Sequence, residues 1–343
     1  MQVWLTDLQH LLAHGDAVVL VTVARVEGSA PREPGTKMIV TREDARHTIG
    51  GGHLEWKAIE TARQVLKDGM HMQRMRRLER FALGPSLGQC CGGAVVLAFE
   101  RLDVSDLNWV TSLAKRTAQR LSTVRSVSFA PLPDAVMLSD PEPGAQDTDC
   151  LLWDGAGFDE SGALLTETIA PRDFNLVLFG AGHVGAALVR VLATLPCRVT
   201  WVDERDAAFP AAPFVPANVK IEPNDAPDEA VDNAPPGTYF IVMTHNHAVD
   251  LVLAERILAR GDFAFFGMIG SHTKRRQFEH RLAARGIDPA RIGRMVCPIG
   301  IGGIVDKAPE VIAVAAAAQL LQAVEANMAH ASSQSSQSPQ QTV

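Results

Sequence analysis

The sequence predicts an α/β protein built from a C-terminal doubly wound parallel sheet and a separate N-terminal α+β domain. From residue 175 onward, short apolar runs alternate with segments of helical periodicity, which is the pattern of parallel strands joined by crossover helices. Between residues 131 and 172, prolines and acidic residues accumulate, which predicts a loop-rich surface connection. We therefore expect a first domain over 1–130, this connection over 131–172, and a second domain over 173–330.

The first 130 residues predict a mixture of helices and strands. In order, we expect an amphipathic helix over 3–14, strands at Ala17–Val26 and Thr36–Val40, a helix over His53–Lys67, a strand at Ala94–Phe99 and a helix around Val104–Val124. The arginine run Arg74, Arg76, Arg77 and Arg80 is typical of a solvated face, or of a surface that docks an acidic partner.

The second half predicts a series of βα units. The expected strands are Leu176–Phe179, Arg198–Val202, Val219–Glu222, Thr238–Thr244, Phe263–Met268 and Met295–Pro298. The expected helices are Val184–Leu195, Val249–Arg260, Thr273–Arg285 and Pro309–Ala326. The last segment, 331–343, is rich in Ser and Gln, which predicts a disordered tail.

A glycine motif lies where a dinucleotide-type loop belongs. Residues 180–185 read Gly-Ala-Gly-His-Val-Gly between an apolar strand and an apolar helix, and Asp203 ends the next predicted strand. Glycines let the backbone approach a phosphate at the exposed N–H groups of a helix start, and Asp203 would accept a hydrogen bond from a ribose-type hydroxyl. The sequence thus predicts a Rossmann-like domain with candidate ligand contacts at Gly180, Gly182, His183, Gly185 and Asp203. The alternative is a tight strand–helix turn without a ligand.

Two further loops of the second half carry candidate binding residues. His245 and His247 follow a predicted strand in Thr-His-Asn-His-Ala-Val-Asp, and they are candidates for a metal or a phosphate, or for a loop that only caps the next helix. Ser271 and Lys274 follow a glycine-rich turn before a helix, which predicts either an anion site or a solvated basic first turn.

The first half has two glycine loops of its own. Gly50, Gly51 and Gly52 open a predicted helix, a geometry suited to a flat or phosphorylated ligand, or to a plain turn. Cys90 and Cys91 lie in Leu-Gly-Gln-Cys-Cys-Gly-Gly, where thiolates would be accessible soft ligands or nucleophiles. A buried cysteine or a strained vicinal disulfide are the alternatives. Cys150, Cys197 and Cys297 lack such a context, and we expect them to be inert.

Composition excludes several classes of function. A net charge of −7 and 6% aromatic residues argue against a nucleic-acid partner. The N-terminus has no secretory signal pattern, and the apolar runs are too short to span a bilayer. Five cysteines, two of them adjacent, do not form a disulfide framework. We therefore expect a cytoplasmic protein with neither a nucleic-acid nor a membrane partner.

Seven motifs in order make the chain similar to the XdhC/CoxI family. They are Gly28–Gly35 with Lys37-Met38, Ile49–Glu55, Gln89–Gly93, Gly180–Gly185 with Asp203-Glu204-Arg205, Thr244–Asp250, Gly270–Arg275, and Pro298–Gly302. The resemblance implies an N-terminal XdhC/CoxI-type domain and a chaperone that binds the molybdenum cofactor (molybdopterin). It also implies cooperation with a cysteine desulfurase that sulfurates the cofactor, and delivery to the xanthine dehydrogenase apoenzyme.

The resemblance suggests how the candidate residues would share one cofactor. The Gly180–Gly185 loop would take its phosphate end, Gly50–Gly52 would line the pterin, and Cys90 or Cys91 would lie near molybdenum, with Cys91 the candidate metal contact. On this hypothesis the chain turns over no substrate itself, and a homodimer is plausible. The rivals are an NAD(P)-dependent oxidoreductase, which the Rossmann-like half favours, and a pure interaction module that bridges desulfurase and apoenzyme.

Overall fold

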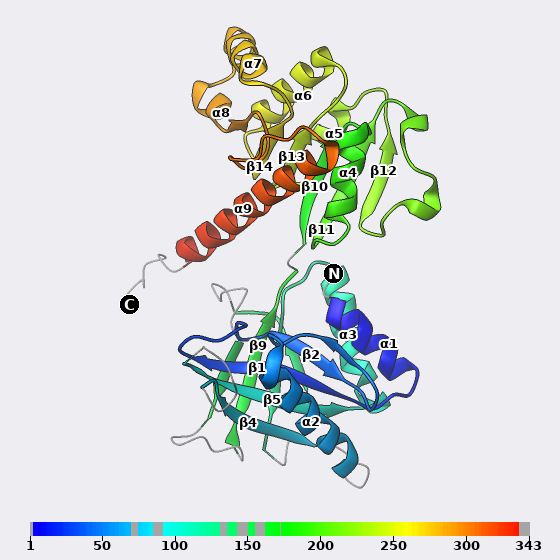
Figure 1. Cartoon of the computed structure of the whole chain (residues 1–343), viewed down its shortest axis with the longest axis vertical. Helices are drawn as coiled ribbons and strands as arrows, with labels where there is room; N and C mark the ends of the chain where they lie inside the picture. Colours follow the sequence, from blue (N-terminus) through cyan, green and yellow to red (C-terminus); the bar gives the residue numbers. More distant parts are fainter. Residues whose placement is uncertain are drawn as a thin grey trace. The chain divides into compact units, whose positions relative to one another are not determined.

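A computed structural model describes residues 3–69, 75–84, 92–130, 136–142, 150–154, 162–171 and 173–335. The chain divides into two compact units, with the first ending at Pro171 and the second beginning at the next residue (Figure 1). Each unit has its own sheets and its own buried core.

The first unit contains two antiparallel sheets, with strand orders β3-β2-β1-β5-β4 and β7-β6-β9-β8. Its strands are β1 (Val18–Glu27), β2 (Lys37–Val40), β3 (Ala45–His47), β4 (Arg76–Ala82), β5 (Ala94–Leu102), β6 (Thr123–Ser128), β7 (Met137–Ser139), β8 (Cys150–Trp153) and β9 (Leu164–Ile169). Its helices are α1 (Val3–Ala13), α2 (Gly52–Asp68) and α3 (Leu107–Ala118).

Strand β1 is buried on both sides of the larger sheet. Val19 and Val21 pack in the core that α2 covers, whereas Val18 and Leu20 pack in the core that α1 and α3 cover. A strand with both faces covered needs a continuous apolar run rather than an alternating one. This explains why the segment Ala17–Val26, apolar except for Thr22 and Arg25, predicts the strand clearly.

The first unit also differs from the expectations in two places. The predicted helix around Val104–Val124 ends at Ala118, because Thr123 already begins β6. The segment 131–172, expected as a connection, contributes β7, β8 and β9 to the smaller sheet. These strands are short, and their outward residues are exposed, so their apolar signal is weak.

The arginine run forms part of a strand. Arg76, Arg77 and Arg80 lie on β4, where Leu78 and Phe81 turn inward and are buried. Because arginines are so frequent in this segment, its two buried apolar positions do not stand out as a strand pattern in the sequence. Arg74 lies outside the described residues.

Between the two sheets of the first unit lies a network of four buried charges. Arg125 on β6 donates to Glu100 at 2.5 Å and to Glu167 at 2.8 Å. Lys37 also donates to Glu167. Burial opposes ionisation of Glu167, but the two cations outweigh it and lower its pKa. The two acids and two bases neutralise one another, which buried charges require.

The second unit is a six-stranded parallel sheet of order β12-β11-β10-β13-β14-β15. Its strands are β10 (Phe174–Phe179), β11 (Cys197–Asp203), β12 (Val219–Pro223), β13 (Tyr239–Val242), β14 (Phe265–Met268) and β15 (Met295–Val296). Its helices are α4 (His183–Leu192), α5 (Asp228–Asp232), α6 (His247–Arg260), α7 (His272–Ala284), α8 (Pro289–Gly293) and α9 (Pro309–Ser335). The strand order reverses between β10 and β13, which confirms the doubly wound Rossmann-like prediction.

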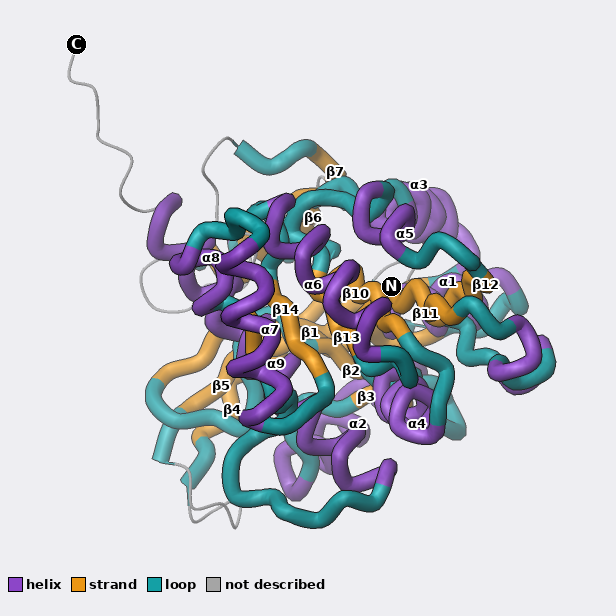
Figure 2. Tube along the Cα trace, turned by 90° about the horizontal axis from the view of Figure 1, so that it is seen from above, coloured by secondary structure: helices purple, strands orange, loops and turns teal. Residues whose placement is uncertain are grey.

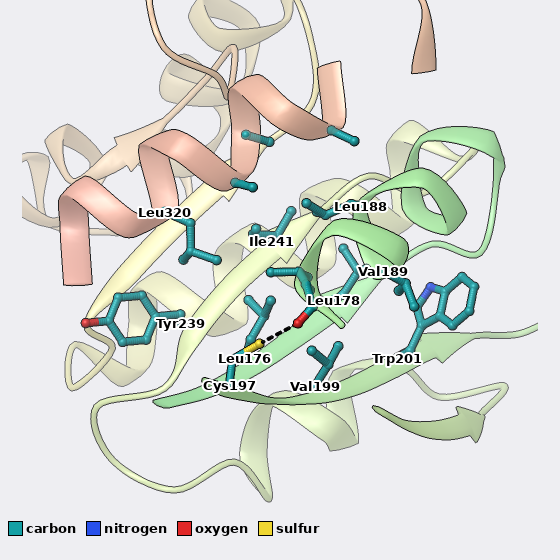
Figure 3. Close-up of a cluster of buried hydrophobic side chains, with 14 of the residues drawn as sticks. Leu176, Leu178, Leu188, Val189, Cys197, Val199, Trp201, Tyr239, Ile241 and Leu320 are labelled. Carbon is teal, nitrogen blue, oxygen red and sulfur yellow. Dashed lines mark hydrogen bonds between the residues drawn. The ribbon is translucent and has the colours of Figure 1, made fainter. Parts of the chain in front are cut away.

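Alternate residues of β10 are buried in two hydrophobic cores, one on each face of the sheet. Leu176 and Leu178 pack with α4 and α9, as Figure 3 shows for the cluster that includes Leu320 of α9. Val177 and Phe179 pack on the opposite face with α5, α6 and α7. In Figure 2 the strands of this sheet are orange and the flanking helices purple.

Helix α9 is long and apolar enough, by length and composition, to match a membrane span. Its residues Ala313, Ala316, Ala317 and Leu320 are buried in the core of the second unit, and their spacing forms one helical stripe. This packing is that of a core helix in a folded domain. The helix runs to Ser335, past the expected start of the tail, and residues 336–343 lie outside the described part.

Candidate functional site

The loop between β10 and α4 requires two of its glycines for the fold itself. Gly180 has a φ of +111°, and a Cβ there would lie 2.3 Å from the Met243 carbonyl oxygen. A Cβ on Gly185 would lie 2.1 Å from the carbonyl oxygen of Gly180. That same carbonyl accepts a hydrogen bond from the Trp201 indole at 3.0 Å. The loop is thus packed tightly against β11 and β13.

Gly182, the middle glycine of this loop, is not required by the packing of the loop. Gly182 has an ordinary φ of −76°, and no atom of its surroundings lies within 4 Å of the position that a Cβ would take. A side chain would fit there in the structure as it stands, so the fold does not explain this glycine. Close approach of a ligand to the backbone would explain it. His183 follows as the exposed first residue of α4.

Asp203, at the end of β11, has partners within the protein. Its Oδ2 accepts from the Ala181 N–H at 2.6 Å, and both carboxylate oxygens accept from the Arg205 guanidinium at 2.9 Å. The Arg205 N–H adds a fourth bond, at 3.0 Å. Burial alone would raise the pKa of Asp203, but these hydrogen bonds lower it to about 2. The carboxylate therefore holds the glycine loop, and its acceptor positions are occupied where a ribose hydroxyl was expected.

Lys274, an expected anion contact, forms an internal ion pair instead. Its Nζ donates to Asp250 Oδ2 at 2.5 Å and to the Ile269 carbonyl at 2.9 Å, and only 8% of its side chain is exposed. The other Asp250 oxygen accepts from Thr244 at 2.7 Å. Ser271 caps α7 by accepting the Lys274 N–H. These residues join the starts of α6 and α7 to the end of β13.

The two candidate histidines lie exposed at the start of α6. His245 Nε2 is 3.6 Å from Glu204 Oε1, and His247 is the first residue of the helix, after the capping side chain of Asn246. In the part of the chain that the structure describes, no group of three or more His, Cys, Asp or Glu side chains could hold a metal ion.

A small cavity of about 20 Å³ lies at the carboxyl edge of this sheet. It occupies the crevice beside the point where the strand order reverses, the usual ligand position in open α/β sheets. Its lining residues are Phe179, Val202, Asp203, Glu204, Pro227, Thr244, His245, Asn246 and Val249. Pro227 lies outside every predicted motif, because its segment meets the strand ends only in the folded sheet.

In the first unit, the triple-glycine loop binds its own carboxylate. Gly50, Gly51 and Gly52 all have positive φ, and Glu55 Oε2 accepts the N–H groups of Ile49 and Gly51, both at 3.1 Å. Two amides that a phosphate would need are thereby satisfied. These two amides are therefore not free to bind a phosphate.

Three glycine loops that are distant in the sequence meet at this point. A Cβ on Gly50 would lie 2.5 Å from Cβ of Pro31, in the Gly28–Gly35 loop. A Cβ on Gly93 would lie 2.4 Å from the carbonyl oxygen of Ser29, in the same loop. We call these contacts the first-domain glycine cluster. Cys90 and Cys91 lie outside the described residues.

The described cysteines behave as expected of structural thiols. Burial raises the pKa of Cys150 to about 12 and that of Cys197 to about 11, and it also raises the pKa of Cys297. Thiols with raised pKa values stay protonated at neutral pH and are poor nucleophiles.

Comparison with known proteins gives matches along both units. A family model described as the XdhC Rossmann domain matches residues 176–320, and one described as the XdhC and CoxI family matches residues 11–79. A Bacillus subtilis (strain 168) protein, named as a probable xanthine dehydrogenase subunit, is 25% identical over 335 residues, which are 92% of this chain and 96% of that protein. The "Uncharacterized protein YqeB" of Escherichia coli (strain K12) is 28% identical over 176 residues, 49% of this chain and 30% of that protein.

Among solved structures, a xanthine dehydrogenase from Bacillus halodurans is similar, with a TM-score of 0.72 and 20% identity. The alignment covers 94% of this chain and 96% of that chain, and the likeness shows a shared fold. The two matched family ranges together make up more than half of this chain, one in each unit. The protein therefore belongs to the XdhC and CoxI family, and its second unit is an XdhC Rossmann domain.

Proposed function

We propose that this protein is an accessory protein of xanthine dehydrogenase that binds the molybdenum cofactor, holds it for sulfuration and inserts it into the apoenzyme. Family membership and the name of the Bacillus subtilis relative support the association with xanthine dehydrogenase. The protein would turn over no substrate itself, and a cysteine desulfurase would be its second partner.

The observation that carries this proposal is the first-domain glycine cluster. Gly28–Gly35, Gly50–Gly52 and Gly93 meet at one place, and in the sequence Gly93 follows Cys90 and Cys91 closely. Gly51 and Gly92, whose Cβ positions have no atom within 4 Å, leave backbone open to a flat pterin, and a thiolate is a soft ligand suited to molybdenum. Because Glu55 satisfies two of the loop amides, the phosphate end of the cofactor would bind elsewhere.

The test is to identify what the purified protein holds. After denaturation, released molecules are identified by mass spectrometry and pterin fluorescence, and molybdenum is quantified. A protein without pterin is then titrated with released cofactor. We expect bound pterin with molybdenum, and activation of apo-xanthine dehydrogenase by the loaded protein. Failure to bind cofactor even on titration would overturn the proposal, and a retained nicotinamide with hydride transfer would favour the oxidoreductase.

The cysteine assignment has its own test. Cys91→Ala is expected to reduce cofactor loading and transfer, whereas Cys150→Ala is the matched control, because burial keeps the Cys150 thiol protonated. Cys90→Ala tells the two adjacent thiols apart. Loading and transfer at the wild-type level in both Cys90→Ala and Cys91→Ala would remove sulfur from the proposed site.

A further inference from the structure

The smaller sheet of the first domain has one face turned away from the core. Its inward face carries Arg125, Glu167 and Cys150, which lie side by side in the strand register. The alternate residues of the four strands therefore point outward, and we call them the outer sheet face. They are Val124, Ser126 and Ser128 on β6, Met137 and Ser139 on β7, Leu151 and Trp153 on β8, and Leu164, Thr166 and Thr168 on β9.

Large apolar side chains are exposed on the outer sheet face. The exposed fraction is 66% for Met137, 60% for Trp153, 47% for Leu151 and 38% for Leu164. Trp153 lies directly opposite Leu164 in the register, and Leu151 precedes Trp153 by two residues on the same side of β8. Three of these side chains are therefore neighbours on one surface. A group of exposed apolar side chains marks an interaction surface, whereas single ones are ordinary.

The outer sheet face is also uncharged. None of the described residues that form it is acidic, basic or histidine, although charged residues make up 21% of the chain. Charges appear directly after two of the strands, where Asp140 pairs with Arg116 and Asp154 pairs with Arg25. An uncharged centre with charged residues at its rim is the usual composition of a protein–protein interface.

We propose that the outer sheet face packs against the same face of a second copy of this chain, related by a two-fold axis. A charged partner surface would lose its hydration here without gaining an ion pair, so the partner must be uncharged and apolar as well. The same face of a second copy meets this requirement. Two copies that each carry a net charge of −7 repel one another, and contact through uncharged faces limits this repulsion.

The size of the outer sheet face predicts a weak dimer. Four strands, of which β6 and β9 have six residues each, give a face of about 20 Å by 20 Å. Two such faces with their rims bury on the order of 1,000 Å² in total, which is the lower end for a specific interface. We therefore expect a dissociation constant in the micromolar range. The proposal goes beyond cofactor delivery and does not depend on the cofactor.

Sedimentation velocity of the full chain tests the proposal. At about 100 μM, well above the expected dissociation constant, the wild type should have twice the monomer mass of 36.9 kDa. Trp153→Glu places a charge in the contact and is expected to weaken dimerisation at least about tenfold. Trp56→Glu is the matched control and should dimerise like the wild type, because Trp56 is 57% exposed but lies on α2, outside the outer sheet face.

Two further measurements separate loss of contact from loss of folding. Leu151→Lys changes a second exposed side chain of the face and should weaken dimerisation as Trp153→Glu does, with the thermal unfolding temperature of the monomer unchanged in both variants. In the wild type, peroxide should oxidise Met137 more slowly at high than at low protein concentration, since the partner covers it. Met328, 44% exposed in the second domain, should oxidise at the same rate at both concentrations.

The possible outcomes decide between occupants of the outer sheet face. A wild-type chain that stays monomeric at about 100 μM would overturn the proposal, and so would a dimer that neither Trp153→Glu nor Leu151→Lys weakens. A monomer whose binding to apo-xanthine dehydrogenase is lost in these two variants would assign the face to that partner instead of a second copy. Each measurement is made on protein without cofactor, so its outcome does not bear on cofactor binding.

Discussion

The two domains bury their charged side chains in different places. In the first domain, Arg125 and its carboxylate partners lie in the middle of strands, between two sheets. In the second, Asp203, Asp250 and Lys274 all lie at the carboxyl edge of the sheet, at strand ends and in first helical turns. The Arg125 network thus joins two sheets in one domain, whereas Asp203, Asp250 and Lys274 shape the edge where open α/β sheets bind ligands. Asp106 and Asp173 are buried outside these two groups.

The largest expected effect comes from breaking the network of the first domain. Arg125→Met leaves Glu100 and Glu167 without their shared partner, and we expect the free energy of unfolding to fall by about 3–5 kcal/mol. Urea denaturation measures this. Arg80→Met is the control, because the Arg80–Glu27 pair is about half exposed and should contribute little to the free energy of unfolding. Equal effects of the two substitutions would show that the buried network does not hold the sheets.

A somewhat smaller effect is expected at the edge of the second domain. Lys274→Met removes the cation from Asp250, which keeps only the hydrogen bond from Thr244. We expect a loss of about 3 kcal/mol, confined to residues 173–335 when hydrogen exchange is followed by mass spectrometry. Loss of protection spread equally over the first domain would contradict this account of two independent cores.

The glycine loop offers a matched pair of substitutions. Gly185→Ala forces a methyl group against the Gly180 carbonyl oxygen, and we expect a cost of about 2 kcal/mol. Gly182→Ala meets no such atom and should leave the thermal unfolding temperature unchanged. Similar destabilisation in both variants would show that Gly182 is required by the fold rather than by a ligand.

The smallest effect concerns pH. The folded-state pKa of Asp203 is about 2, below its ordinary value of 3.8, so its ionised form stabilises the fold fully above about pH 4 and loses this contribution as pH falls toward 2. Asp203→Asn should therefore be less stable than the wild type at pH 6, and the difference should shrink between pH 4 and 2. A difference that stays constant over this range in acid-unfolding curves would contradict the assignment.

The parallel sheet could be predicted from the sequence because its strands are buried on both faces. Leu176–Phe179 and Tyr239–Val242 are uninterrupted apolar runs, and each is followed by a helical pattern. The smaller sheet of the first domain could not, since β7 and β8 have only three and four residues and are mostly exposed. The pairing of β7 and β9 with β6, and of β8 with β9, depends on contacts that a local pattern does not contain.

The positions of the candidate site residues could be predicted from the sequence, but their ion-pair and hydrogen-bond partners could not. The glycines of 180–185 and Asp203 lie where the motif places them, at one edge of the sheet. That Asp250 neutralises Lys274, and that Glu55 folds back onto the amides of its own loop, are contacts set by the packing of helix starts. A lysine or a run of glycines in a sequence does not show whether a carboxylate of the protein itself already occupies that lysine or those backbone amides.

Trp201 gives the second domain a built-in optical reporter. The chain has five tryptophans, and the other four lie before residue 154. The Trp201 indole is buried, and its N–H donates to the Gly180 carbonyl at the base of the glycine loop. With the other four replaced by phenylalanine, the emission of Trp201 would follow any rearrangement of this loop directly, without a label.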